Sequence, residues 1–93
     1  VQKAKSLNPD NLSVLDTMGW ISYRKGEINQ AIEWLGKAQT GNAGNPIVNY
    51  HLGMAYYKAG NSGKAKEYLR TALAAKVVFP GKDEAEKTMA SIR

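Results

Sequence analysis

The segment Leu52–Gly60, LGMAYYKAG, decides the fold of this chain because it repeats an earlier segment at a fixed distance. At an offset of 34 positions, Gly53 corresponds to Gly19 and Gly60 corresponds to Gly26. The other pairs at this offset are Ala31 with Ala65, Leu35 with Leu69, Ala38 with Ala72, and Tyr23 with Tyr57. Self-similarity at a fixed period of about 20 to 50 residues is typical of repeat architectures. The sequence therefore predicts a repeat fold.

Between the turns, apolar residues recur three or four positions apart, which is the spacing of an amphipathic α-helix. Gly26 and Gly60 suit left-handed helix caps, and Pro46 suits the first turn of a helix. The predicted fold class is all-α, with helix-turn-helix hairpins and a final capping helix. The expected helices cover residues 11–25, 28–40, 46–59, 62–76 and 83–92.

The repeated small residues have a packing reason. Two antiparallel helices approach closely only where a side chain is small or absent, so Gly19 and Gly53 are expected where the helices of each hairpin cross. Ala31 and Ala65 are expected to face these glycines from the second helix. A larger side chain at such a crossing costs about 1–3 kcal/mol through overpacking.

With this spacing the chain resembles the tetratricopeptide repeat. The matching residues are Leu15, Met18, Gly19, Ala31, Leu35 and Ala38 in one unit, and Leu52, Gly53, Tyr56, Ala65, Leu69 and Ala72 in the next. Departures from the family pattern are Ser22, Ala43, Asn49 and Val77. The resemblance implies a single domain over residues 1–93 with four parts. These are the end of an upstream repeat (1–11), repeat one (12–45), repeat two (46–79) and a capping helix (80–93).

The chain starts Val1–Gln2–Lys3, without an initiator Met, and reads as mid-protein sequence. We expect it to be the C-terminal part of a larger repeat protein. The turn Phe79–Gly81 and the charged helix after it are similar to the ends of some bacterial repeat proteins, so the expected source is bacterial. The absence of cysteine is compatible with either a cytoplasmic or a periplasmic location.

The family resemblance also implies a concave groove lined by the first helix of each repeat, where a peptide binds. The implied groove positions are Ser13, Asp16, Trp20, Tyr23, Arg24, Ile47, Tyr50, Met54, Tyr57 and Lys58. Several are aromatic, Met or Arg side chains, the types enriched at binding hot spots. Other roles stay open. Trp20 could pack on an upstream repeat, Tyr23 and Tyr57 could support packing between repeats, and Arg24 and Lys58 suit helix C-termini.

The sequence offers little to any other class of function. A lone histidine, His51, and no cysteine do not make a metal site, so no metal or cofactor is expected. Gly60–Lys64 lacks the spacing of a phosphate-binding loop. The formal charge of +5 is spread along the chain, which argues against a nucleic-acid footprint. No set of residues suggests an enzyme active site. No apolar run is long enough to span a membrane.

The predicted function is a non-enzymatic scaffold that binds a protein or peptide segment in the groove, with no small-molecule substrate. The first alternative is a structural end of a longer solenoid with no ligand of its own. A second alternative is a basic repeat that binds a polyanion, which rests only on the net charge. We also expect self-association through an N-terminal face that exposes Leu7, Leu12 and Leu15.

Overall fold

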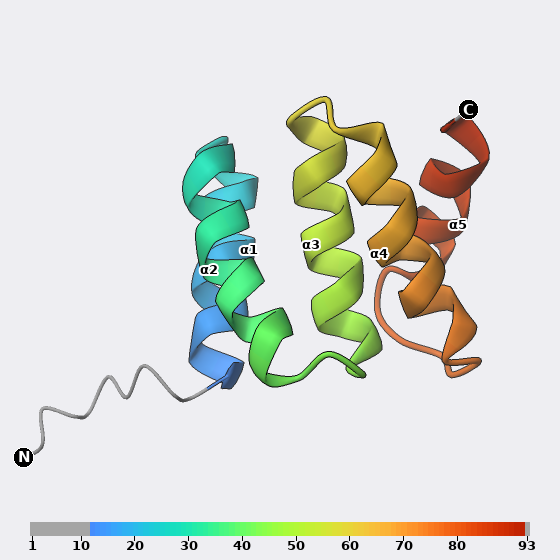
Figure 1. Cartoon of the computed structure of the whole chain (residues 1–93), viewed down its shortest axis with the longest axis horizontal. Coiled ribbons are helices and arrows are strands. Elements are labelled where there is room, and N and C mark those ends of the chain that lie inside the picture. The colour runs from blue at the N-terminus through green and yellow to red at the C-terminus, as the bar shows by residue number, and fades with distance from the viewer. Residues whose placement is uncertain (1–11, 93) are drawn as a thin grey trace, which may run out of the picture.

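The structure is a computed structural model that describes residues 12–92 (Figure 1). This part of the chain holds five α-helices and no strand, which confirms the all-α prediction. The predicted bounds differ from the observed ones by two residues at most. The upstream repeat expected over residues 1–11, including Leu7, lies outside the described residues. The helices are α1 (Leu12–Arg24), α2 (Ile28–Gly41), α3 (Pro46–Lys58), α4 (Ser62–Ala74) and α5 (Lys82–Ser91).

Two helical hairpins, α1–α2 and α3–α4, stand side by side, and α5 follows beside α4 (Figure 1). Gly26 and Gly60 end the first helix of each hairpin with φ of +87°, a conformation that glycine adopts without a steric cost. Asn45 caps α3, because its side-chain oxygen accepts the backbone N–H of Ile47 at 2.8 Å. Local sequence signals therefore determine where the helices of both hairpins begin and end.

Inside each hairpin the first helix carries its glycine where the second helix comes closest. A Cβ on Gly19 would lie 2.5 Å from Leu35 Cγ, and a Cβ on Gly53 would lie 2.7 Å from Leu69 Cγ. The glycines lie at the crossings, as predicted, and the atoms nearest to them belong to Leu35 and Leu69. The missing side chain makes room for the leucine that fills the middle of the hairpin, and both leucines are fully buried.

At the N-terminal end of the core, Leu15 packs with Ala38 and Val48. Leu15 is only 5% exposed, so the prediction that it belongs to an exposed apolar face is wrong. Nearby, Asn49 replaces the expected apolar residue and is fully buried. Its amide donates to the carbonyl oxygens of Ala43 at 2.8 Å and Asn45 at 2.9 Å. This polar departure from the repeat pattern therefore anchors the loop between the hairpins.

The C-terminal segment packs against the second hairpin. Helix α5 contacts both α4 and α3, in the same way that α3 contacts both α2 and α1. Phe79 and Ile92, at the two ends of this segment, are buried together with Tyr50 and Met54. Gly81, at φ +93°, lies so close to Tyr50 that a Cβ would be 2.5 Å from its ring. Thus α5 occupies the place of the first helix of a further repeat.

Candidate functional site

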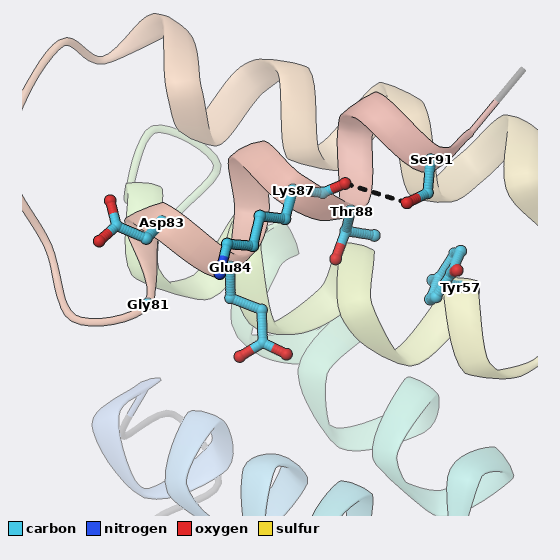
Figure 2. A pocket seen from close by; sticks show the side chains of 7 residues that line it. All are labelled: Tyr57, Gly81, Asp83, Glu84, Lys87, Thr88 and Ser91. Atoms are coloured by element: carbon cyan, nitrogen blue, oxygen red, sulfur yellow. Dashed lines mark hydrogen bonds between the residues drawn. The ribbon is translucent and has the colours of Figure 1, made fainter.

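A surface groove of about 550 Å³ runs between α3 and α5 (Figure 2). Tyr57 forms its α3 side, and this residue is 39% exposed. The other lining residues belong to α5 or to its N-cap: Gly81, Asp83, Glu84, Lys87, Thr88 and Ser91. The volume lies within the range of about 300–1,000 Å³ that is usual for ligand pockets. The groove is therefore large enough to hold a side chain and the backbone that carries it.

Three of the α5 residues in the groove continue the repeat register. Counting 34 positions from Tyr50, Met54 and Tyr57 gives Glu84, Thr88 and Ser91. These residues were not predicted as site residues, because the last helix was interpreted only as a cap. Applying the 34-residue offset once more, from the second repeat to the last helix, would have identified them. Helix α5 thus supplies groove positions as well as a cover for the core.

On the α1 side, three rings form a stack that joins the two hairpins. Trp20 lies between Tyr23, at 4.5 Å between centroids, and His51, at 4.0 Å. Both neighbours are close to parallel with it, at 5° and 18°. Trp20 therefore packs on the following hairpin through His51. Each such aromatic pair contributes about 0.5–1.5 kcal/mol beyond its buried area.

The stack is held at its α3 end by a polar contact between hairpins. Nδ1 of His51 lies 2.8 Å from a carboxylate oxygen of Asp16, and both side chains are mostly buried. A hydrogen bond to a charged group is shorter and stronger than a neutral one. Asp16 and His51 thereby fix α1 against α3. Sequence reasoning placed Asp16 in the groove but gave no role to His51, since its partner lies 35 residues away.

The carboxylate of Glu84 sits near phenols from two other helices. Burial raises the pKa of Tyr23, and the negative charge of Glu84 raises it further. For Tyr50 the causes are burial, then Glu84, then Tyr23. The charge of Glu84 therefore acts on phenols of both α1 and α3, and Figure 2 shows its carboxylate pointing away from its own helix toward the α1–α2 hairpin. The three first helices of the register thus converge on one face.

The predicted groove residues fall into different environments on this face. Tyr50 and Met54 are each 4% exposed beneath the C-terminal segment, and so belong to the core and not to the accessible surface. Trp20, Tyr23, Asp16 and Ile47 are partly buried, whereas Tyr57, Arg24 and Lys58 are exposed. Tertiary contact with Phe79 and α5 buries Tyr50 and Met54, and the internal repeat alone did not predict this contact.

Among residues 12–92, no three His, Asp or Glu side chains gather in a way that could hold a metal ion. None of the five described helices is long and apolar enough to cross a membrane.

The chain was compared with known proteins. Residues 46–76 match the tetratricopeptide repeat model. A TPR repeat-containing protein of Pseudomonas aeruginosa is 47% identical over 38 residues, which cover 41% of this chain and 6% of that relative. The chain thus matches only a small part of this bacterial relative. Both matches agree with the paired helices, the 34-residue offset and the glycine crossings described above. The second hairpin is thus similar to a tetratricopeptide repeat, the unit of a family of helical protein-interaction repeats, and the first hairpin corresponds to it at the 34-residue offset.

Proposed function

We propose that this chain binds an extended peptide segment of a partner protein on the face formed by α1, α3 and α5. The observation that carries the proposal is the α3–α5 groove, which opens beside the exposed ring of Tyr57. Stacked repeats create concave surfaces that are used for binding. The accessible contacts are provided by the partly buried Trp20 and Tyr23, by Tyr57, and by the α5 residues of the groove.

The rigidity of this face supports a binding role. The Trp20 stack and the Asp16–His51 contact hold α1 against α3, and the buried Phe79 holds α5 against α3. A surface that is ordered before binding loses less conformational entropy when a ligand arrives. An extended peptide of a few residues matches a face that crosses three helices. We therefore propose that the chain acts as a scaffold that binds its partner and does not catalyse a reaction.

The test compares a groove variant with a surface variant. Binding of fluorescently labelled extended peptides is measured by anisotropy for the wild type, Tyr57→Ala and Val78→Ala. Val78 is 92% exposed and does not line the groove. Tyr57→Ala is expected to weaken binding about tenfold, as at an aromatic hot spot, whereas Val78→Ala leaves it unchanged. Equal effects of the two substitutions, or no binding by the wild type, would favour a purely structural role.

A further inference from the structure

Thr88 differs from the other hydroxyl side chains in the helices near it. Thr71 and Ser91 satisfy their hydroxyls by donating to the carbonyl four residues earlier, at 3.0 and 3.1 Å. Thr88 is only 8% exposed, lines the groove, and makes no such bond to any described residue. In Figure 2 its oxygen points down, away from the ribbon of α5, and its methyl group points toward Tyr57. The oxygen of Thr88 is not among the fully buried unsatisfied polar atoms of the described chain, so it stays open to water or to a ligand in the groove.

Glu84 also lacks a partner for its charge within the described chain. It makes no ion pair with any residue of 12–92, although it faces the groove. Asp83 lines the same groove, and Lys87 is the single cationic side chain there. Two carboxylates and one ammonium leave the groove with an excess of negative charge. A cationic ligand group would therefore be attracted to it.

The aromatic surroundings suit the same kind of ligand. The ring of Tyr57 closes the side of the groove, and its face attracts a cation within about 6 Å. The phenols of Tyr23 and Tyr50 also lie near Glu84, since its negative charge raises the pKa of both, although Glu84 itself is exposed. A carboxylate, an unpartnered hydroxyl and an aromatic ring together form a set of groups that complements an ammonium or guanidinium group.

From this geometry we infer that the α3–α5 groove is a subsite for a Lys or Arg side chain of the bound peptide. Glu84 pairs with the cationic group, Thr88 Oγ1 accepts a hydrogen bond from it, and Tyr57 packs along the aliphatic stem. The inference rests on the proposed peptide binding and adds a preference for peptides that carry a positive charge. The C-terminal helix selects the partner by charge, in addition to covering the hydrophobic core.

The experiment uses three sets of extended peptides of Ala, Leu and Ser that differ only at one scanned position. That position holds Lys, uncharged norleucine of similar length, or Glu. Dissociation constants are measured by NMR titration for the wild type, Glu84→Gln, Thr88→Val and Glu86→Gln. Glu86 is exposed on the same helix but does not line the groove, so its variant is the matched control.

The wild type is expected to bind the best Lys peptide about tenfold more tightly than its norleucine counterpart, because a charge-assisted hydrogen bond is gained. Glu84→Gln removes this preference, Thr88→Val reduces it, and Glu86→Gln keeps it. Equal binding of the Lys and norleucine peptides, with shifts on the groove face, overturns the inference but keeps the proposed function. An absence of shifts with all three sets overturns both.

Discussion

Gly53 and Gly36 are both glycines within helices, but their surroundings predict opposite effects for the same substitution. A Cβ on Gly53 would lie 2.7 Å from Leu69 Cγ and 3.2 Å from the backbone nitrogen of Leu69, whereas nothing lies within 4 Å at Gly36. Gly53→Ala is expected to lower the free energy of unfolding by about 1–3 kcal/mol through overpacking. Gly36→Ala is expected to raise it by up to about 1 kcal/mol through helix propensity.

Urea denaturation followed by circular dichroism measures both changes, and Gly36→Ala serves as the control for the general effect of alanine in a helix. If Gly53→Ala were as stable as Gly36→Ala, the close crossing of α3 and α4 would be contradicted. The same logic applies to Gly19, where a Cβ would meet Leu35 at 2.5 Å.

The raised pKa values of Tyr23 and Tyr50 predict that the free energy of unfolding falls at high pH. Burial, and then the charge of Glu84, raises the pKa of both phenols above the ordinary value of 10.0. Above pH 10 the unfolded chain therefore loses protons that the folded chain keeps. The stability linked to these phenols is complete below that pH and is lost as the pH rises through their folded pKa values.

Absorbance of tyrosinate during an alkaline titration, together with urea unfolding at each pH, checks this expectation. Glu84→Gln should lower the pKa of both phenols, because the carboxylate charge is removed while burial remains. The environment assigned to these tyrosines would be wrong if all phenols of the folded protein ionised together with those of the unfolded chain.

At the scale of the helix, substitutions of Phe79 and Val78 test which contacts hold α5 against the second hairpin. Phe79 is buried with Tyr50 and Ile92, while Val78 is 92% exposed. Phe79→Ala is expected to destabilise the docked C-terminal segment by about 3–5 kcal/mol, because it leaves a cavity in the core. Val78→Ala should change stability by less than about 0.5 kcal/mol.

Amide hydrogen exchange locates the effect of each substitution. In Phe79→Ala, protection should fall in α5 and around Tyr50 and Met54, while α1 and α2 keep theirs, since repeats contact mainly their neighbours. Uniform loss of protection along the whole chain would mean that α5 and both hairpins unfold as one unit, contrary to this prediction.

The helices themselves could be predicted from sequence because their signals are local. Gly26, Gly60 and Pro46 mark the ends of helices, and the apolar spacing marks their length. The position of α5 depends on contacts between residues far apart, such as Tyr50 with Phe79 at 5.7 Å between ring centroids. These long-range contacts explain why Tyr50 and Met54 were expected on the surface but are buried.

At the scale of the whole molecule, the interface between hairpins depends on a few groups around Trp20. The sequence indicated that Trp20 and Asp16 share a face, but not that His51 joins them, because side-chain pairing between repeats has no periodic signal. A double-mutant cycle on Asp16→Asn and His51→Phe should give a coupling energy of about 0.5–1.5 kcal/mol in urea unfolding. A coupling near zero would show that this contact does not hold the hairpins together.

The register of the repeat also explains the candidate site in the whole molecule. Positions separated by 34 residues meet on the face shared by α1, α3 and α5, as in the series Trp20, Met54 and Thr88. The middle member of this series is buried, and the last lines the groove. The sequence therefore predicted which residues of the two hairpins share this face, whereas the packing of α5 determines which of them remain accessible.

The most direct test of the proposed binding face is a map of backbone NMR shifts during titration with the extended peptides. The account predicts that shifts gather at Trp20, Tyr57, Glu84 and Thr88, which belong to α1, α3 and α5. Resonances of exposed residues on α4, such as Glu67 and Arg70, should stay in place. Shifts concentrated on α2 and α4, or none at saturating peptide, would contradict the claim that the α1–α3–α5 face binds peptides.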